Sequence, residues 1–301
     1  MPPLKRRVTQ GSCIPFADGP RYDLFCVMLY RHYNPPPPLG RFVELLWLYE
    51  GFRPAHSKER LLPTGTVEIV FDLREDRILA YGRREKMQPF CLSGSVVCGA
   101  HSEFFVIDTA SQDGVMGVHF RSGGAYPFLK LPNGELHNQH VDLGALWGWQ
   151  AVRDLRERVL AEPTPEGKLR RLEEALLARA RGGFERHPAV AFALSEFHTA
   201  PGRRSIAAVT DRTGFSARRF IDLFEKEVGL TPKLFCRVQR FQKVLRTIQS
   251  GCAIDWVEIA LHCGYYDQAH FIHDFRAFSG INPSTYLAAH TPHLNHVPIL
   301  D

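Results

Sequence analysis

The chain has 301 residues, of which 45% are hydrophobic and 23% are charged, and its formal net charge is +5. This length predicts roughly two domains, and the apolar residues suffice for a sizeable core in each. The basic start is not followed by an apolar stretch of signal-peptide length, and the run from Leu24 to Tyr30 is too short to span a membrane. The seven cysteines form no CxxC pair, which favours a reduced, cytoplasmic compartment.

Residues 28–147 are predicted to form a β-rich, barrel-like domain behind a poorly ordered arm, residues 1–27, which is polar and contains Pro and Gly. Short β-branched and aromatic runs recur there at close spacing, as in a small barrel or sandwich. The predicted strands are Thr66–Phe71, Arg77–Tyr81, Phe90–Leu92, Ser95–Cys98, Phe104–Thr109 and Val115–Phe120. The dense apolar run from Leu39 to Tyr49 has a mixed period, so its type stays open.

Candidate chemistry in this half of the chain is sparse. His137 and His140 could ligate a metal, but such a pair in a loop is more typical of solvated side chains. Cys91 and Cys98 could form a redox pair, although buried strand thiols are the commoner case. Alternating polar residues could line a barrel mouth or lie on an outward face; they are Glu68, Asp72, His119 and Arg121. No Ser-His-Asp, Walker or dinucleotide motif is evident, so we expect neither an enzyme nor a cofactor.

A helical connector is predicted over residues 148–183. Val152–Leu160 and Lys168–Arg181 are amphipathic segments, separated by a loop that contains two prolines and a glycine. Leucines form a stripe on the second segment, and two apolar residues of the first join it; the five are Leu155, Val159, Leu169, Leu172 and Leu176. This stripe either packs inside the chain or supports a homodimer.

Two stretches of the remaining sequence are copies of one another. Phe220 to Pro232 read FIDLFEKEVGLTP, and Phe271 to Pro283 read FIHDFRAFSGINP, so Phe, Ile, Phe, Gly and Pro recur at an offset of 51 residues. Upstream of each copy lies a shorter amphipathic segment that ends at a glycine, Gly214 or Gly264. A supersecondary unit that is used twice, with two helices joined by a Gly turn, is typical of a tandem helix-turn-helix.

Helix-capping residues support this interpretation. Ser205 and Asp255 are placed to cap the first helix of each unit, and Ser216 and Asp267 the second. Between the units, Thr231 to Ser250 follows helical spacing, and about 20 residues give a rod of about 30 Å. One turn of B-DNA is about 34 Å, so two recognition helices on such a rod could enter successive major grooves.

Charge is unevenly placed along this part of the chain. Residues 201–250 contain eleven basic and four acidic side chains, whereas residues 251–301 contain one basic and five acidic side chains. Phosphate attraction is therefore expected from the first unit and the connecting helix. The last residues, 291–301, form a Pro-containing tail, and the histidines around it are predicted to be disordered; they are His290, His293 and His296.

Residues 184–290 resemble the DNA-binding domain of the AraC/XylS family of bacterial transcription regulators. The resemblance rests on the paired units, on the endings at Gly229–Pro232 and Gly280–Pro283, on Tyr286 and on the string GYYDQAHF that starts at Gly264. It implies promoter DNA as a partner and an amino-terminal domain that senses a ligand, dimerises, or both. RNA polymerase, an unidentified small-molecule effector and a second copy of the chain are further candidate partners.

The amino-terminal half is similar to an uncharacterised sensor domain that is often found before AraC-type units. The strings LLPTGTVEIVF from Leu61, GVHFRSGGAY from Gly117 and VDLGALW from Val141 carry this similarity, which supplies no ligand. The chain is therefore expected to be an α+β protein, with a barrel-like sensor domain, a tandem helix-turn-helix domain over residues 184–290 and a tail.

Base-reading residues should lie early on the second helix of each unit and one turn later. They are predicted to be Arg218, Asp222, Gln268 and His273. Arg218 suits guanine and Gln268 suits adenine, whereas many family members carry Arg at the positions of Asp222 and His273. These two residues could instead be solvated or paired within the chain. The predicted contacts to the DNA backbone are Arg203, Arg204, Ser216, Arg219, Lys233, Arg237 and Arg240.

Two other functions remain open at this point. A DNA-repair enzyme could carry such a domain, but the Cys-His motif of the methyl-accepting relatives is missing. An architectural DNA binder would need no effector, and a metabolite screen on the amino-terminal part would distinguish it from a sensor. The sequence does not identify the promoter, the effector, or activation as against repression.

Overall fold

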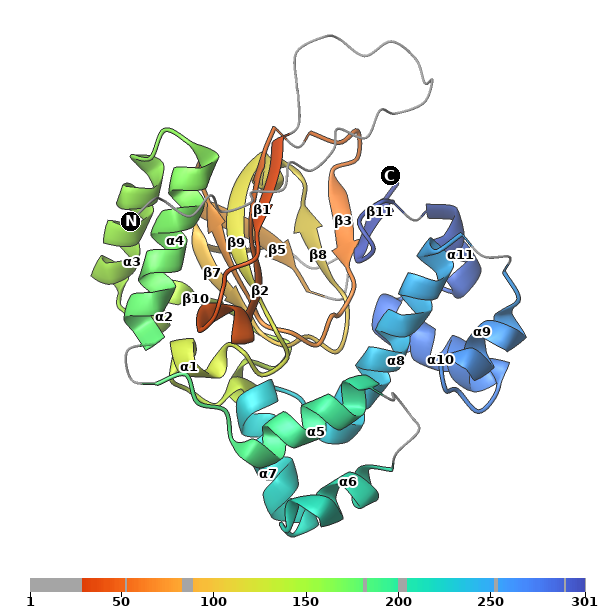
Figure 1. The fold of residues 1–301 in the computed structure, drawn as a ribbon. Helices are drawn as coiled ribbons and strands as arrows, with labels where there is room; N and C mark the ends of the chain where they lie inside the picture. Colours follow the sequence, from red (N-terminus) through yellow and green to blue (C-terminus); the bar gives the residue numbers. More distant parts are fainter. Residues whose placement is uncertain are drawn as a thin grey trace, which may run out of the picture.

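The computed structural model describes residues 29–51, 53–82, 89–180, 183–199, 205–251, 254–289 and 291–300 (Figure 1). The predicted arm, the predicted backbone contacts Arg203 and Arg204, and His290 lie outside the described residues. As predicted, a β-rich part precedes an all-helical part, so the fold is α+β.

Two antiparallel sheets build the amino-terminal part. One has six strands in the order β1-β2-β9-β4-β7-β10, and the other has five in the order β11-β3-β8-β5-β6. Their bounds are β1 Leu29–Tyr33, β2 Val43–Glu50, β3 Lys58–Leu61, β4 Glu68–Asp72, β5 Arg77–Tyr81, β6 Phe90–Ser93, β7 Ser95–Cys98, β8 Phe105–Asp108, β9 Gly114–Phe120, β10 His140–Asp142 and β11 His296–Ile299. All six predicted strands are present, but the two sheets do not close into one barrel.

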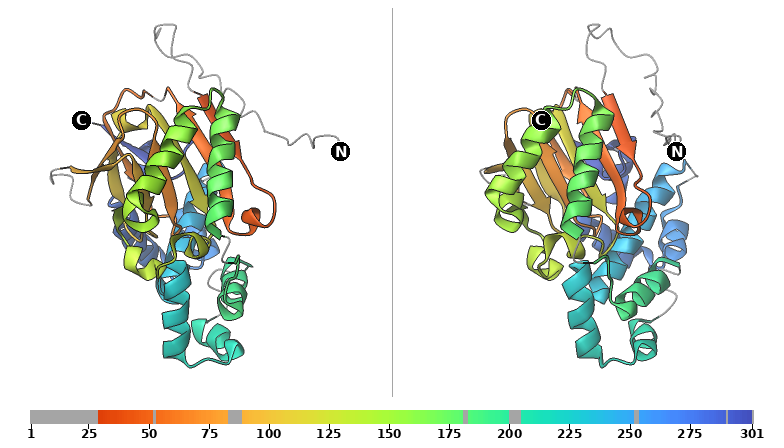
Figure 2. Two further views of the ribbon diagram at one scale, coloured as in Figure 1. Left: turned by 90° about the vertical axis from the view of Figure 1, so that its left-hand side faces the viewer. Right: turned by 60° about the vertical axis from the view of Figure 1, so that its left-hand side comes forward.

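Strand alternation gives the six-stranded sheet two distinct faces. Leu46, Ile69 and Val118 are fully buried on the outer face, where helices α3 (Trp149–Leu160) and α4 (Pro165–Arg179) cover the sheet (Figure 2). The intervening residues point toward the five-stranded sheet, because successive side chains of a strand face opposite sides. Short helices complete this part; they are η1 Leu39–Arg41, η2 Ala110–Gln112, α1 Tyr126–Leu129, η3 Asn133–Leu136 and α2 Leu143–Trp147.

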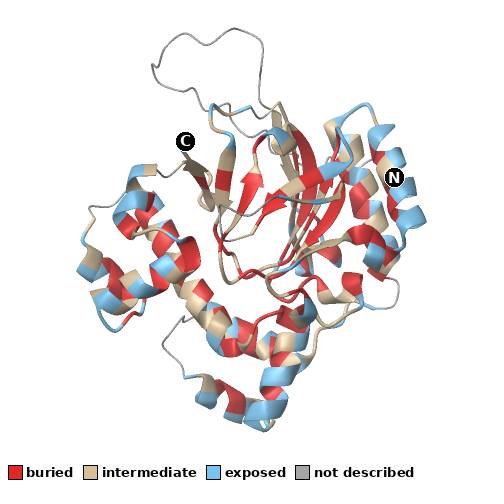
Figure 3. Cartoon of the chain, turned by 180° about the vertical axis from the view of Figure 1, so that it is seen from behind, coloured by how far each residue is buried: buried red, intermediate tan, exposed pale blue. Residues whose placement is uncertain are grey.

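The apolar stripe of α3 and α4 is part of the core (Figure 3). Leu169, Leu172 and Leu176 are at most 3% exposed, and Leu155 and Val159 are each 2% exposed. The stripe therefore packs inside the chain, which is the first of the two interpretations that the sequence left open. It is not available as the face of a homodimer.

The helical part is organised around α8 (Pro232–Gln249), which confirms the predicted connecting helix. Thr231 caps it, Pro232 suits its first turn, and apolar residues such as Phe241 and Leu245 bury one face. Helices α6 and α7 lie toward one end of α8, and α9 and α10 lie toward the other (Figure 1). The bounds are α5 Pro188–Thr199, α6 Ile206–Thr213, α7 Ala217–Val228, α9 Trp256–His262, α10 Gln268–Ser279 and α11 Pro283–Ala289.

The predicted disorder of the carboxy-terminal histidines is wrong for His293 and His296. Strand β11 pairs with β3, and His296 stands opposite Leu61 in the register. The segment 291–299 thus leaves the helical part after α11 and adds an edge strand to the five-stranded sheet. Sequence reasoning missed this strand because it has four residues, includes a proline, and pairs more than 200 residues away along the chain.

Candidate functional site

Helix α7 presents its first turns to solvent. The Ser216 hydroxyl accepts a hydrogen bond from the Arg219 backbone N–H at 3.4 Å, which satisfies one free donor at the helix start. Arg218, Arg219 and Asp222 are exposed, whereas Phe220 and Phe224 are buried on the opposite side. No ion pair joins Asp222 to Arg218 or Lys226 in the described part of the chain, so the first predicted base-reading pair is accessible.

Helix α10 is built in the same way but carries a different surface. The Asp267 carboxylate accepts from the His270 backbone N–H at 2.7 Å, and Asp255 caps α9 through two backbone N–H groups. Gln268 is partly exposed, and the His273 side chain is 79% exposed. Both helix-turn-helix units therefore expose the amino-terminal turns of their second helix, as the repeat predicts.

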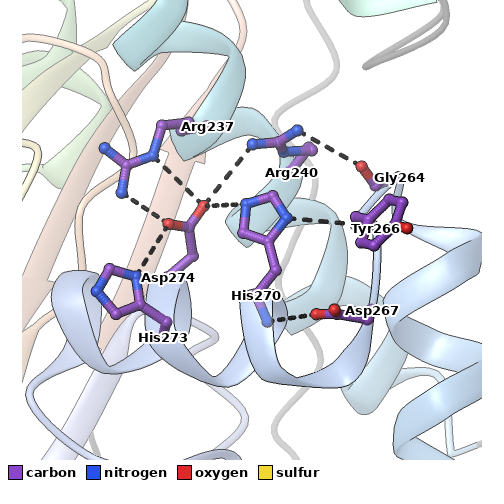
Figure 4. Close-up of polar contacts among 8 residues, drawn as sticks. All are labelled: Arg237, Arg240, Gly264, Tyr266, Asp267, His270, His273 and Asp274. Atoms are coloured by element: carbon purple, nitrogen blue, oxygen red, sulfur yellow. Dashed lines mark hydrogen bonds and ion pairs between the residues drawn. The ribbon is translucent and has the colours of Figure 1, made fainter.

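An acidic side chain of α10 holds two of the predicted phosphate contacts (Figure 4). Asp274 is buried, and its carboxylate accepts from the Arg237 guanidinium at 2.7 and 3.4 Å, while Arg240 approaches it at 3.7 Å. Both arginines also lie against aromatic rings: Arg237 over Phe278 and Arg240 over Tyr265. The structure therefore brings Arg237 and Arg240 to an internal ion-pair network between α8 and α10.

Lys233 remains exposed in the first turn of α8, close in sequence to α7. Arg218 and Arg219 lie in the first turn of α7, whereas Lys233 follows its carboxy-terminal end, so these exposed cations are distributed along the first unit. The second unit has Asp274 at the base of its exposed surface, with His270 and His273 within 4 Å of that carboxylate. The exposed side chains of the two units therefore differ in charge, as their sequences do.

The amino-terminal part contacts α7 and α10 at equivalent positions of the repeat. The Asn133 side-chain amide donates to the Glu227 carbonyl at 2.7 Å, and the Phe104 backbone N–H donates to the Phe278 carbonyl at 3.0 Å. Glu227 and Phe278 are 51 residues apart, which is the repeat offset. The same two carbonyls, in the last turn of each helix, are therefore held by one domain.

Two equivalent glycines allow this close approach. Gly229 and Gly280 end α7 and α10 with φ of +93° and +73°. A Cβ on Gly229 would lie 3.0 Å from the Ala100 Cβ, and a Cβ on Gly280 would overlap the Phe104 ring. These glycines were predicted only as helix ends, and nothing in the sequence indicated that they also adjoin the other domain.

A second candidate site is a cavity of about 300 Å³ between the two sheets, which we call the inter-sheet cavity. Alternate residues of the six-stranded sheet line it, among them Trp47, Val70 and His119. Ile107 from β8 and His296 from β11 face it from the other sheet. The cavity therefore combines walls from the amino-terminal part with one strand from the carboxy-terminal end.

Two of the alternating polar residues meet in this cavity. The His119 Nδ1 and a Glu68 carboxylate oxygen form a very short contact, so neither side chain lies on an outward face. Burial alone would raise the pKa of Glu68, but the charge and hydrogen bond of His119 hold it below its ordinary value. Conversely, burial would lower the pKa of His119, and Glu68 raises it above its ordinary value. The two groups thus form an ion pair.

Asp72 and Arg121 have other surroundings. The buried Asp72 carboxylate accepts from the backbone N–H groups of Arg74 and Glu75, at 3.1 and 2.7 Å. The Arg121 guanidinium donates to the Gly40 carbonyl at 3.0 Å. Of the four alternating polar residues, only Glu68 and His119 line the inter-sheet cavity.

The other candidate side chains are separated or have ordinary partners. His137 shares a hydrogen bond of 2.8 Å with the Ser102 hydroxyl. His140 belongs to β10 and lies among aromatic rings, so the prediction that both histidines are solvated side chains of one loop is wrong. Cys91 and Cys98 are free thiols, and Cys91 is exposed. Within the described residues, no group of three His, Cys, Asp or Glu side chains could hold a metal ion.

The cavity residues Trp47, Tyr49 and Glu59 were not singled out from the sequence. The signal for the first two was present, because Leu45, Trp47 and Tyr49 alternate along the run that was left unassigned. Glu59 offered no such signal, since its partner His296 comes from the far end of the chain, with 2.7 Å between the His296 Nδ1 and the carboxylate.

Comparisons with known proteins match the two parts separately. Residues 209–289 match a family described as a helix-turn-helix domain, and residues 31–142 match a domain of unknown function. No curated protein matches the chain. No helix among the described residues has the length and apolar character that a membrane crossing requires.

Solved structures of ToxT from Vibrio cholerae are similar to this chain. A 1.65 Å structure has a TM-score of 0.44 and 11% identity, covering 81% of this chain and 97% of that one. An apo variant has a TM-score of 0.44 and 9% identity, covering 89% and 99%. A form bound to an unsaturated fatty acid has a TM-score of 0.43 and 10% identity, covering 89% and 97%.

Proposed function

We propose that this chain is a DNA-binding transcription regulator that reads two successive major grooves of its promoter. It carries an AraC-type helix-turn-helix domain behind a domain of unknown function. The observation that supports this most is the exposure of the first turns of α7 and α10, on helices that lie toward opposite ends of α8. Eighteen residues give α8 a length of about 27 Å, close to one turn of B-DNA at about 34 Å.

In this proposal the two units contribute differently. Arg218 donates two hydrogen bonds to a guanine, and Gln268 pairs with an adenine in the other half-site. Asp222 and His273 stand one turn later on each helix and contact neighbouring bases. Ser216, Arg219 and Lys233 bind phosphates next to the first half-site, where the exposed positive charge is concentrated.

Arg237 and Arg240 receive a different role from the one predicted. Their bonds to the buried Asp274 carboxylate leave them committed inside the protein. If both arginines were released to bind phosphate, the Asp274 carboxylate would stay buried without a guanidinium partner, which would lower the stability of the fold. We therefore assign them to the positioning of α10 against α8.

The amino-terminal domain is proposed to set the relative orientation of the two recognition helices. It bonds equivalent carbonyls of α7 and α10, through Asn133 and Phe104, and leaves their amino-terminal turns free for DNA. A change in that domain can thus alter the spacing of the two reading surfaces without touching either one. This is how a small molecule or a protein partner would control DNA binding.

Genome-wide mapping of bound DNA, followed by anisotropy titration of the recovered sites, tests the reading of bases. Arg218→Ala should weaken binding to the cognate site by about 1–3 kcal/mol and relax the preference at one guanine. Lys226→Ala removes one positive charge from the last turn of the same helix and serves as the matched control. Equal losses in both variants on cognate and scrambled half-sites would contradict the assignment of Arg218.

Altered half-site spacing tests the orientation. The wild-type chain should lose affinity when one base pair is inserted between the half-sites, and Asn133→Ala should reduce that discrimination. Asn34→Ala is the control, because its amide donates to the Glu44 carbonyl at 2.8 Å, away from both recognition helices. If Asn133→Ala keeps the full spacing preference, the Asn133 contact does not set the orientation.

A further inference from the structure

The inter-sheet cavity, which is open to solvent near Glu44, has an unusual set of acidic side chains. Glu44, Glu59 and Glu68 line it, and no Lys or Arg occurs among the described residues of its wall. An anionic ligand would meet three carboxylates, while the one histidine of the wall with a raised pKa, His119, is already paired with Glu68. A cationic group would find the reverse, a set of acceptors that is already in place.

Two of these carboxylates are held in their charged form. Burial would raise the pKa of Glu59, but hydrogen bonds from His296 and His56 hold it below its ordinary value. The Glu59 carboxylate lies 2.6 Å from His56 and 2.7 Å from His296. Glu68 is likewise held below its ordinary pKa by His119. Each carboxylate retains acceptor capacity, because an ionised carboxylate has about four lone-pair positions.

The rest of the wall suits the body of an organic molecule. Tyr30 and Tyr49 stack with ring centroids 4.5 Å apart, and Trp47 meets Tyr49 edge-on at 5.8 Å. Val70 and Ile107 add apolar surface. Aromatic rings also attract cations through their electron-rich faces, so this wall and the carboxylates favour the same charge. At about 300 Å³ the space is at the lower end of small-molecule sites, which span about 300–1,000 Å³.

One polar atom of this wall is left without a partner. His140 lines the cavity, and its Nε2 is buried with no hydrogen bond to any described residue. Burial lowers the pKa of His140 to about 4, so the ring is neutral near pH 7 and Nε2 is free to accept or donate a hydrogen bond. Buried polar atoms are normally satisfied, but Nε2 has almost no accessible surface, so the case for a ligand rests on the carboxylates and the aromatic wall.

We infer that the inter-sheet cavity binds a small organic cation, an amine that carries a compact aromatic or aliphatic body. This inference rests on the proposed function, because it identifies the molecule class through which the amino-terminal domain would control DNA binding. The ammonium group lies among Glu59, Glu68 and Glu44, and the body packs against the wall of Trp47 and Tyr49.

The carboxy-terminal segment 291–299 belongs to this site. His296 bonds Glu59, and the Tyr49 hydroxyl lies 3.4 Å from His293. The same segment is tied to the helical part, because Gln242 of α8 donates to the Asn295 side chain at 2.8 Å and Tyr286 of α11 donates to the Leu294 carbonyl at 2.8 Å. An amine that engages Glu59 competes with His296, so occupancy reaches the second helix-turn-helix unit through this segment.

Three probes of similar size and different charge test the ligand class. The full-length chain is titrated by calorimetry with 2-phenylethylamine, 2-phenylethanol and 3-phenylpropionate at neutral pH. The amine should bind at least about tenfold more tightly than either of the others. Tighter or equal binding of the carboxylate, or no binding of the amine at millimolar concentration, would overturn the inference.

Variants locate the binding. Glu68→Gln should remove most of the preference for the amine over the alcohol, and Val70→Phe should abolish binding of both by filling the cavity. Glu75→Gln, an exposed change next to the same strand, should leave the preference intact. If Glu68→Gln fails to fold, Glu59→Gln provides the second carboxylate variant. An unchanged preference in every folded carboxylate variant would place the amine elsewhere and refute the site.

DNA binding separates this inference from the proposed function. A chain that binds promoter DNA but discriminates against the amine refutes the ligand class alone. A chain that binds the amine but no specific DNA refutes the proposed function alone. If both hold, the amine should change DNA affinity in the wild-type chain. Gln242→Ala removes the bond between α8 and Asn295 without touching the cavity wall, so it should keep amine binding while losing most of that change. A full effect in Gln242→Ala would remove the segment 291–299 from the route.

Discussion

Replacing Arg237 and Lys233 separately distinguishes an internal ion pair from a phosphate contact on the same helix. Both residues lie on α8 and both were predicted to bind the DNA backbone. Asp274 is 3% exposed and the Arg237 side chain is 31% exposed, so Arg237→Ala leaves a buried carboxylate with one guanidinium, that of Arg240 at 3.7 Å.

The expected magnitude follows from that geometry. Breaking a fully buried pair costs about 3–5 kcal/mol, but the partial exposure of Arg237 and the remaining Arg240 reduce this to about 2–3 kcal/mol. Part of the loss comes from the guanidinium that covers the Phe278 ring, at 5.2 Å from its centroid. Lys233→Ala, at an exposed position, should stay within about 0.5 kcal/mol of the wild type.

Urea unfolding followed by circular dichroism, and anisotropy titrations at several KCl concentrations, measure the two effects. Lys233→Ala should reduce the slope of log K against log salt by about 0.9, whereas Arg237→Ala should leave that slope unchanged. A double-mutant cycle of Arg237→Ala with Asp274→Ala should show coupling of at least about 1 kcal/mol. A lower salt slope for Arg237→Ala, with no loss of stability and no coupling, would refute the internal role.

Three further predictions concern other parts of the molecule. Gln268→Ala should change the base preference of the second half-site with little loss of overall affinity, measured on half-site libraries. Gly280→Ala should lower the free energy of unfolding by about 1–3 kcal/mol more than Gly214→Ala, because both have φ of +73° but only a Cβ on Gly280 would overlap a neighbouring side chain. His119→Gln should flatten the stability profile above about pH 6.5: the raised pKa of His119 stabilises the fold fully below that pH, and this stabilisation is lost as pH rises through the folded-state pKa. Equal unfolding curves for Gly280→Ala and Gly214→Ala would contradict the second prediction, and equal pH profiles of stability for His119→Gln and the wild type would contradict the third.

The helical part was predictable from the sequence because its determinants are local. Capping residues such as Ser205 and Asp267, the Phe pairs four residues apart and the terminal glycines each act within one or two helical turns. The repeat doubled each signal, so that the two units and the helix between them were placed with little error. The strands of residues 68–120 were predicted for the same reason, since β-branched runs mark them individually.

The pairings between distant parts of the chain were not predictable in this way. Asp274 entered the sequence analysis only as one of the five acidic residues of 251–301, because no local pattern tells an exposed carboxylate from one buried beneath Arg237. His296 was assigned to a disordered tail, because a four-residue strand with a proline has almost no signal apart from its partner strand. Both errors come from interactions whose energy depends on tertiary burial and not on sequence spacing.

The same difference determines where regulation can act in this molecule. The turns of α7 and α10 that we propose to read bases are specified locally, by capping residues and helix-terminal glycines. Their relative placement is specified by long-range contacts: Asn133 on Glu227, Phe104 on Phe278, and the segment 291–299 on α8. Phe105 lines the inter-sheet cavity directly after Phe104 in the chain, so the cavity wall and one of these contacts share a strand end. A ligand that moves this wall can therefore shift the second unit while the surface of each unit that faces DNA stays intact. In that case the ligand should change the preferred spacing of the half-sites, and it should leave the preferred bases within each half-site unchanged.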